Sequence, residues 1–371
     1  MPDKNFMRRY TLKCGPMGQE GFEIGNISSA AEDALHISFS IEKSDSETAN
    51  TAKVQIWNLS DRNLKILETR DCIVELNAGY GNHMALILVG EVTSAVTTSD
   101  HADRMTELEV VDGRVALRDT VIRVSLNGTV NCKDVYSYIA SQMGIPIVSA
   151  GDLSYTVLPN GFSFVGTARN GLQKLARCCG HSWSIQNQIL QVTWPGRPIG
   201  VQGYLLNNDS GLIDVPKRIT VSSTSSSDDR NERNGWEVEY FLNGAIGVND
   251  LVMLESSKAS GYFRVHKVTM DGDNYEGDWI CTAQLLEIRA EPSLDAKAAG
   301  KSSGNIRSGD KVKVIRTIEQ SGKTKGYQYS GGTFVCWHEV YDVIQAKGDR
   351  AVIGIGSTVT AAVKIADLEK V

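Results

Sequence analysis

Two glycines near the end of the chain, Gly354 and Gly356 in GDRAVIGIGSTVTAAVKI, have the spacing of a phosphate-binding loop. A dinucleotide site also needs a strand before the glycines, a helix after them and a third glycine, so that the backbone can approach a pyrophosphate. Val359 occupies the third glycine position, and the β-branched residues around it favour a strand. The stretch therefore predicts a hairpin whose strands are RAVIGI and VTAAVK.

The acidic stretch DGDNYEGD (271–278) has Asp271 and Asp273 at the first and third positions of a calcium loop. Tyr275 and Glu276 stand at the fifth and sixth positions, where such a loop needs a metal ligand and a glycine. Short acidic residues and glycine also supply turn geometry. We interpret the stretch as the tip of a hairpin between YFRVHKVTM and WICTAQLLEI.

Cysteine and histidine pairs are the remaining candidates for chemistry. Cys336 and His338 would share one face of a strand, but nothing in their spacing orients the base that a thiol nucleophile needs. Cys178, Cys179 and His181 suggest a metal site, yet adjacent cysteines rarely bind one tetrahedral ion and no second ligand pair completes the set. Buried thiols at a helix end are the better interpretation.

Motifs that define common enzymes are missing or lack their context: Gly-x-x-x-x-Gly-Lys does not occur, and the Gly-x-Ser-x-Gly match GKSSG (300–304) lies in a small, polar linker rather than between a strand and a helix. We therefore expect no catalytic residues, no metal and no cofactor. The seven cysteines are an odd number without framework spacing, and we interpret them as reduced thiols of a chain made in a cytosol. The N-terminus lacks the apolar segment of a secretory signal, and no apolar run approaches membrane-spanning length.

Charge is distributed unevenly along the 371 residues, whose formal net charge is -6. From Lys301 onward there are 11 basic and 7 acidic residues, whereas the chain before it has 27 basic and 37 acidic residues. A net of -10 before Lys301 argues against a protein that wraps nucleic acid by neutralising phosphates. The basic tail is a candidate separate domain.

Alternation of apolar residues predicts mostly strands up to about residue 121, as in HISFSIEKS (36–44), with one short helix capped by Ser60 or Asp61. Two further helices follow, capped by Asn131 and Thr167, which bury, among others, Val135, Tyr138, Ile139 and Met143 in the first and Leu172, Leu175 and Ala176 in the second. A hairpin with its bend at Gln186-Asn187-Gln188 ends this α+β part. Strands then resume after the polar run SSTSSSDDRNERN (222–234).

The fold class predicted is mainly β with an α+β insertion. Five segments follow from the pattern: a first barrel-like domain at 1–120, a middle α/β domain at 121–204, a second barrel-like domain at 205–290, a linker at 291–305 and a barrel at 306–371.

The last segment resembles a bacterial SH3-like barrel in its opening GDKVKV, its apolar YDVIQAKGDRAVIG, the terminal hairpin and the closing IADLEKV. In that family such modules bind partner proteins or cell-wall peptide. An aromatic cluster could line the partner-binding groove or fill the barrel core: Tyr327, Tyr329, Phe334, Trp337 and Tyr341.

The first 290 residues are similar to baseplate hub proteins of contractile phage tails and phage-tail-like bacteriocins. The similarity rests on ANTAKVQIWNLSDRNLKIL (49–67), FSFVGTARNGLQKLARCCGHSWSIQNQILQV (162–192) and the strand and turn order of 249–288. It implies a structural, non-enzymatic homotrimer that adapts a six-fold tail tube to a three-fold central spike and leaves a conduit for DNA or tape-measure protein. The implied partners are the tail tube protein, the spike and other baseplate proteins.

The resemblance implies a place in the baseplate of a virion or tail-like particle, assembled in the bacterial host cytoplasm. DNA would be a partner only in transit, because an acidic wall repels phosphates. The alternatives are a cell-wall-binding or cell-wall-degrading tail protein targeted by the SH3-like domain, and an adaptor of a non-contractile tail. A minimal hub lacks the SH3-like domain.

Overall fold

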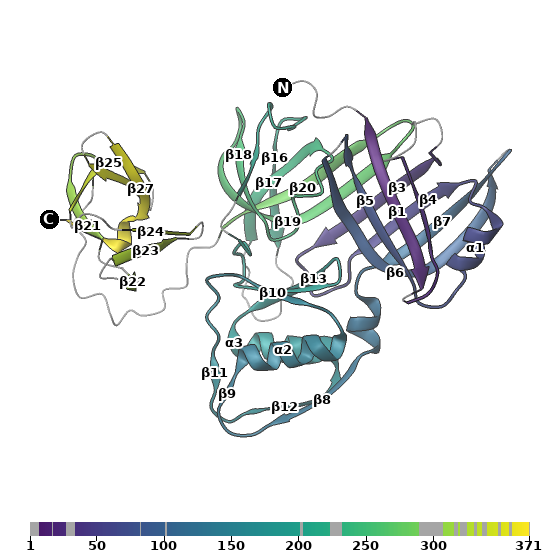
Figure 1. Cartoon of the computed structure of the whole chain (residues 1–371), viewed down its shortest axis with the longest axis horizontal. Helices are drawn as coiled ribbons and strands as arrows, with labels where there is room; N and C mark the ends of the chain where they lie inside the picture. The colour runs from purple at the N-terminus through teal and green to yellow at the C-terminus, as the bar shows by residue number, and fades with distance from the viewer. Residues whose placement is uncertain are drawn as a thin grey trace. The chain divides into compact units, whose positions relative to one another are not determined.

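The computed structural model describes residues 7–16, 18–26, 34–81, 83–100, 102–200, 203–222, 232–288, 307–314, 318–319, 325–329, 332–335, 340–347, 350–355 and 358–370. The chain divides into two compact units, Met1–Arg289 and Ala290–Val371. The larger unit contains the long antiparallel strands and the described α-helices (Figure 1). None of the described helices is long and apolar enough to cross a membrane.

A 13-stranded sheet forms the body of the larger unit, in the order β16-β17-β20-β19-β3-β4-β7-β6-β5-β1-β2, with β15 and β18 joined through β19. Its strands are β1 (Arg8–Pro16), β2 (Phe22–Gly25), β3 (Ile37–Ser44), β4 (Thr51–Trp57), β5 (Cys72–Tyr80), β6 (His83–Asp100), β7 (Asp103–Val111), β15 (Gly203–Leu206), β16 (Lys217–Ser222), β17 (Glu232–Phe241), β18 (Leu251–Glu255), β19 (Ser260–Asp273) and β20 (Trp279–Glu287).

Alternation along these strands places one face in a common core. On β3, Ile37, Phe39 and Ile41 are at most 3 % exposed, whereas the residues between them point outward. Strands from both predicted barrel-like segments contribute to this core and to the same sheet, because β3 pairs antiparallel with β19. The mainly β fold class is confirmed, while the predicted domain boundaries stay a prediction.

The joint between the two halves of the core is closed by a reciprocal pair of aromatic residues. The indole Nε1 of Trp279 donates to the carbonyl of Gly79 at 3.2 Å, and the hydroxyl of Tyr80 donates to the carbonyl of Trp279 at 2.9 Å. The Trp279 ring also packs edge to face on Phe39. These bonds satisfy polar atoms that would otherwise be buried without partners.

A helix and a turn of helix accompany the sheet. The helix α1 (Asp61–Leu67) begins after Ser60, whose side chain accepts the N–H of Asn63, which confirms the predicted cap. The segment η2 (Val115–Asp119) leads from the sheet into the middle module, which we define as residues 115–194.

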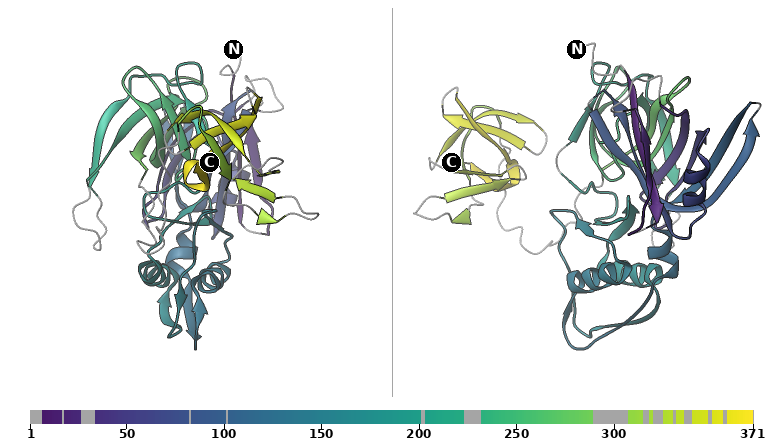
Figure 2. Two further views of the ribbon diagram at one scale, coloured as in Figure 1. Left: turned by 90° about the vertical axis from the view of Figure 1, so that its left-hand side faces the viewer. Right: turned by 45° about the vertical axis from the view of Figure 1, so that its right-hand side comes forward.

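The middle module has its own core. It contains α2 (Cys132–Met143), α3 (Ala168–Cys179), β8 (Val121–Leu126), β9 (Val130–Asn131), β10 (Ile147–Ser149), β11 (Val157–Leu158), β12 (Phe162–Thr167), β13 (Ser182–Gln186) and β14 (Ile189–Thr193). The two helices lie side by side, with the β10-β14-β13 sheet on one side and the β8-β12 and β9-β11 ribbons on the other (Figures 1 and 2).

The caps of both helices are confirmed. Asn131 and Thr167 accept backbone N–H groups of the first turns, and Gly144 and Gly180 end the helices in the left-handed conformation. The predicted inward face of α2 is confirmed at Val135, Ile139 and Met143, while Tyr138 packs against the core only in part. Tyr136 is fully buried, whereas Tyr138 is partly exposed and donates to the carbonyl of Arg123, because the buried stripe includes positions 135, 136, 139 and 143.

The prediction that all cysteines are reduced is wrong for two of them. Cys132, the first residue of α2, and Cys179, the last of α3, form a disulfide that closes a loop of 47 residues in sequence separation. Cys14, Cys72, Cys178 and Cys281 are free, and only Cys178 of these four is exposed. Spacing gave no sign of the pair, because each partner is placed by a different helix.

The smaller unit contains β21 (Lys311–Val314), β22 (Ile318–Glu319), β23 (Lys325–Tyr329), β24 (Gly332–Val335), β25 (Tyr341–Lys347), β26 (Arg350–Ile355), β27 (Thr358–Lys364), η3 (Ile365–Asp367) and β28 (Leu368–Lys370). The predicted terminal hairpin is confirmed, since β26 pairs antiparallel with β27. A five-stranded sheet in the order β27-β26-β25-β21-β28 surrounds a small core that includes Val312, Val343 and Ile353. Its SH3-like identity stays a prediction.

Two glycines of the β8-β12 ribbon region provide a matched test of the fold. Both have positive φ, 76° at Gly161 and 75° at Gly128. A Cβ on Gly161 would lie 2.1 Å from the carbonyl oxygen of Leu126, whereas a Cβ on Gly128 meets nothing within 4 Å. We expect Gly128→Ala to cost about 1–2 kcal/mol of unfolding free energy for its backbone conformation alone. Gly161→Ala should cost about 1–3 kcal/mol more, because the ribbon must move.

Urea unfolding of the two variants beside the wild type measures this difference. Equal losses for Gly161→Ala and Gly128→Ala would contradict the close approach of residues 126 and 161.

Candidate functional site

The aromatic residues predicted to contact a partner lie in the smaller unit. Tyr341 is 1 % exposed and packs in the core, where it pairs across strands with Val312. For Tyr341 the structure therefore supports the core interpretation. The side chains of Tyr327, Tyr329, Phe334 and Trp337 lie outside the residues whose surroundings the structure describes.

The acidic stretch 271–278 comprises the end of β19 and the turn that leads into β20, which confirms the hairpin interpretation. Asp273 Oδ1 accepts the backbone N–H groups of Tyr275 at 2.9 Å and Glu276 at 3.0 Å, as expected of a turn residue. Across the described ranges, no three His, Cys, Asp or Glu side chains are grouped to hold a metal ion. Cys336 and His338 lie outside the described residues.

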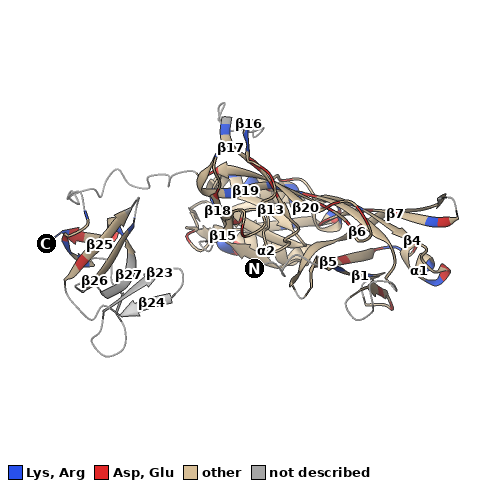
Figure 3. Ribbon diagram, turned by 90° about the horizontal axis from the view of Figure 1, so that it is seen from above, with Lys and Arg blue, Asp and Glu red and all other residues tan. Residues whose placement is uncertain are grey.

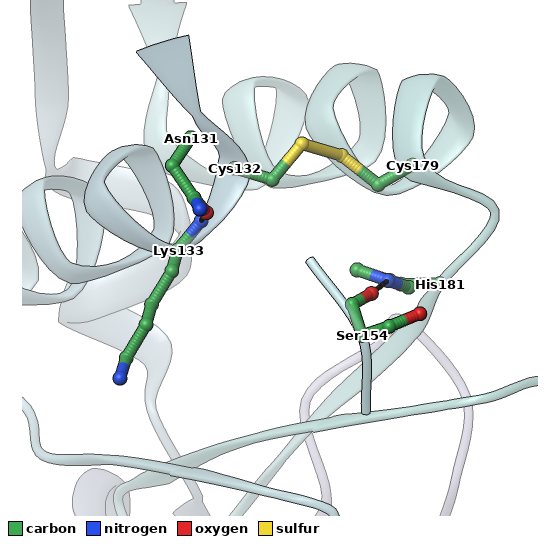
Figure 4. The surroundings of a disulfide bond; sticks show 6 residues. All are labelled: Asn131, Cys132, Lys133, Ser154, Cys179 and His181. Atoms are coloured by element: carbon green, nitrogen blue, oxygen red, sulfur yellow. Dashed lines mark hydrogen bonds between the residues drawn. A yellow bond between two sulfur atoms is a disulfide. The ribbon is translucent and has the colours of Figure 1, made fainter. Parts of the chain in front are cut away.

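His181 belongs to an aromatic cluster, and its neighbour Cys179 is held in the disulfide (Figure 4). The His181 ring stacks on Tyr136 and meets Trp194 edge to face, with ring centroids 5.8 and 5.0 Å apart. Burial lowers the pKa of His181, and its Nε2 lies 3.2 Å from the carbonyl oxygen of Ser154. A packed histidine explains this position without a metal.

The outward side of the long sheet carries rows of polar and charged residues. Three rows of paired residues cross its central strands. One row joins Glu239, Thr282, Thr269, Glu42 and Thr51; the next joins Phe241, Ile280, Asp271, Ser40, Lys53 and Glu109; the third joins Asp273, Ser38, Gln55 and Glu107. Paired residues on neighbouring strands point to the same side of a sheet, so these side chains share one face.

We call this surface the acidic face and define it by the charged residues of these rows and of the adjacent row through Gln284. They are Glu42, Glu107, Glu109, Glu237, Glu239, Asp271 and Asp273, with Lys53, Lys217 and Lys267. Seven carboxylates against three lysines leave an excess of four negative charges. Figure 3 shows the charged residues along these strands.

Two ion pairs neutralise part of the acidic face. Lys267 Nζ lies 2.9 Å from Glu42 Oε1, and Lys53 Nζ lies 3.6 Å from Glu107 Oε1. Glu42 and Lys53 remain 57 % and 62 % exposed, so these pairs are screened by water and contribute little to stability. The remaining carboxylates give the face its negative potential.

Asp273 at the border of the acidic face is held in its charged form. Burial raises the pKa of this carboxyl group, but its hydrogen bond with His36 and the two backbone N–H groups of the turn outweigh burial and lower the pKa overall. The His36 ring in turn stacks on Trp57 with centroids 3.9 Å apart. The acidic face therefore keeps this charge well into the acid range.

A surface of this kind repels phosphate groups and other polyanions. The sequence predicted the excess of acidic residues but not their position. A signal was present in the alternation of β3, β4 and β7, where polar and charged residues fill the positions between buried ones. These strands are joined to β17, β19 and β20 by pairing between segments far apart in the sequence. The alternation within one strand does not show which strand lies beside it.

The middle module is attached to the sheet through the tip of its β13-β14 hairpin. Asn187 and Gln188 at the turn have positive φ of 51° and 60°. Asp112, which is fully buried at the end of β7, accepts both of their backbone N–H groups, at 2.6 and 2.8 Å. Lys43 Nζ donates to Asn187 Oδ1 at 2.5 Å, and Asn50 Nδ2 donates to the carbonyl of Ile185 at 2.8 Å.

Burial opposes the charges of this junction. It raises the pKa of Asp112 despite the nearby Lys43, and it lowers the pKa of Lys43 to about 8 despite the nearby Asp112. The two residues thus depend on each other and on the turn for their ionised forms.

A second polar contact holds the other side of the hairpin. Arg264 is 2 % exposed, and its Nη1 lies 2.5 Å from Asp45 Oδ2 and donates to Asn249 Oδ1 at 2.7 Å. Asn249 in turn donates to Gln191 Oε1 on β14 at 2.9 Å. Burial raises the pKa of Asp45, but Arg264 and His266 outweigh it and lower the pKa to about 2.

Comparisons with known proteins identify the fold. The chain is similar to the 43 kDa tail protein of prophage MuSo2 from Shewanella oneidensis, with 11 % identity and a TM-score of 0.50, over 75 % of this chain and 96 % of that one. The fold is thus that of a phage tail protein. No protein-family model matches the sequence, and a comparison with curated proteins finds no match either.

Two further solved structures are similar at lower TM-scores. The tail protein from Neisseria meningitidis MC58 has 10 % identity and a TM-score of 0.49, over 75 % of this chain and 96 % of that one. The Escherichia coli c3393 protein has 9 % identity and a TM-score of 0.49, over 91 % and 96 %. It is described as a component of the type VI secretion system with structural similarity to the T4 phage tail proteins gp27 and gp5.

The hairpin anchor is tested by Asp112→Asn. The amide keeps the shape of the side chain but offers one acceptor oxygen where two N–H groups need one each. We expect a loss of about 1–3 kcal/mol in unfolding free energy and faster amide exchange at residues 187 and 188. The matched control is Asp119→Asn at an exposed site, where the effect should stay below about 1 kcal/mol. Unchanged exchange at the turn would contradict the anchor.

Asp45 supplies a pH-dependent contribution. Its pKa falls from 3.8 to about 2 in the folded state, so its ionised form stabilises the protein above about pH 4 and this stabilisation is lost as the pH falls towards 2. Asp45→Asn should lower the unfolding free energy by roughly 2 kcal/mol or more at pH 7, and the difference from wild type should shrink below pH 4.

Urea unfolding at pH 7, 4 and 3 measures the Asp45 effect, with the exposed Asp71→Asn as control. A difference that does not change with pH would exclude the ionised carboxylate as its source.

Proposed function

We propose that the chain is a structural, non-enzymatic baseplate hub of a phage or phage-like tail. The observation that carries this proposal is the fold shared with a tail protein over three quarters of the chain and nearly all of that protein.

In the proposed assembly three copies form a ring that joins a six-fold tail tube to a three-fold central spike. Its partners are the tube protein, the spike, other baseplate proteins and the tape-measure protein. The continuous sheet supports this arrangement, because it holds two groups of strands, around β3 and β19, together in each copy, so that three copies would bring six such groups to the ring.

The acidic face is the part of the chain best suited to line the conduit. Its excess of four negative charges repels the phosphates of passing DNA and prevents them from being trapped. Its side chains are anchored on paired strands rather than on loops, so the wall they form is stiff. The middle module is held at its hairpin by Asp112 and, through Asn249, by Arg264, and it is then available for neighbouring baseplate proteins.

Charge reversal tests the conduit. Glu42→Lys, Glu107→Lys and Glu109→Lys together exchange three negative for three positive charges on the acidic face. We expect the assembled ring to bind double-stranded DNA in a salt-dependent manner and DNA delivery to slow by at least about tenfold, because phosphates are attracted to basic walls.

The matched control places the same charge change elsewhere, as Glu20→Lys, Glu23→Lys and Glu68→Lys, three exposed positions outside the acidic face. Equal effects of both triple variants, or an imaged ring with a basic bore, would reject the conduit. Size-exclusion chromatography with light scattering tests for the trimer.

A cell-wall-degrading tail protein is the alternative outcome. A zymogram on host cell walls distinguishes the two functions, since a clear lytic band would overturn the non-enzymatic hub. Removal of the chain after Pro292 shows whether the smaller unit is needed for assembly or for contact with a partner or cell-wall peptide.

A further inference from the structure

The disulfide ties together the two ends of the middle module's helices. Cys132 begins α2 and Cys179 ends α3, and the bond spans the pair where they lie side by side (Figure 4). The N–H of Cys132 donates to the carbonyl of Thr156. Cys179 is followed by Gly180, which ends α3, and then by the packed His181. One covalent bond therefore restrains both helix ends and the segment between Leu153 and Leu158.

The local structure around the bond does not need it. Asn131 and Gly180 cap the helices without the sulfurs, and Cys132 and Cys179 are 0 % and 6 % exposed within the apolar core. A reduced thiol packs as a small apolar side chain. The module can thus fold with both cysteines reduced, and the bond then adds restraint to a formed structure.

Other described cysteines are poor redox partners. Cys14, Cys72 and Cys281 are buried, and burial raises the pKa of each thiol, to about 12 for Cys281. The thiolate is the reactive form, so these residues exchange slowly. Cys132 and Cys179 are just as buried, so an oxidant reaches them when the module opens; they differ from the other buried cysteines in that their two sulfurs are bonded to each other.

We propose that Cys132 and Cys179 form a redox lock of the middle module, open as two thiols in the reducing cytosol where the chain folds and closed after the particle leaves it. The change of compartment rests on the proposed function; the lock itself does not. Closure needs a disulfide oxidant: a Cys thiolate attacks it and releases one thiol, and the second Cys thiolate displaces the other, so two electrons pass to the oxidant.

The lock disfavours opening of the module. A cross-link that closes a loop of this length reduces the conformational entropy of the unfolded segment, and this lowers the equilibrium constant for opening by about 30-fold to 1,000-fold. Assembly would then proceed with a more compliant module, and the released particle would carry a stiffer one.

The test uses the full-length protein, either reduced with dithiothreitol or oxidised with glutathione disulfide. Thiol titration in denaturant should give seven thiols in the reduced protein and two fewer in the oxidised one. Hydrogen exchange should show that amides of α2 and α3 open about 30-fold to 1,000-fold less often after oxidation.

Two variants separate the lock from other effects. Cys132→Ala with Cys179→Ala should fold and lose the redox difference, whereas Cys178→Ser should keep it. Equal protection of oxidised and reduced wild type, or a Cys178 linkage found by peptide mass spectrometry, would overturn the proposal. These readouts do not depend on particle assembly, so a wild type that fails to form a ring would reject the hub and leave the lock standing.

Discussion

The antiparallel pairing of β3 with β19 is the contact on which the rest of the larger unit depends. It joins Ile41 to Met270 and Phe39 to Gly272, residues more than 200 positions apart, and turns two groups of strands into one sheet with one core. Gly272 is required there, since a Cβ would lie 2.3 Å from the ring of Phe39. The same pairing aligns the outward residues into rows. The core and the acidic face therefore both depend on the pairing of β3 with β19.

Local features of this structure could be predicted from the sequence because they depend on near neighbours. Period-two alternation identified β3 and β4, and Ser60, Asn131 and Thr167 identified the helix starts, since a cap acts within one turn. The inward face of α2 was predicted less well. Tyr136 and Tyr138 are both aromatic and two positions apart, and only packing against His181 and Tyr155 decides which is buried.

Long-range features could not be predicted in this way. Asp112 belongs to no recognisable motif in the sequence. Its role as acceptor for the hairpin turn depends on residues about 75 positions later in the chain. The disulfide was missed because the cysteines were judged by number, spacing and compartment, whereas the fold places the first residue of one helix beside the last residue of another. The acidic composition was visible, but its concentration on one face follows from strand order.

Charge is segregated between the sheet and the middle module, which bears on how a hub could work. Residues 115–194 contain six basic and three acidic residues, although the chain before Lys301 has an acidic excess of ten. The acidic excess therefore lies outside the middle module. In the proposed hub, a wall that must not bind DNA and a module that contacts neighbouring proteins have opposite electrostatic needs, and the fold keeps these two parts on separate cores. The buried junction at Asp112 and Lys43 is where these two parts meet, and it joins them through directed hydrogen bonds rather than through the charges of either surface.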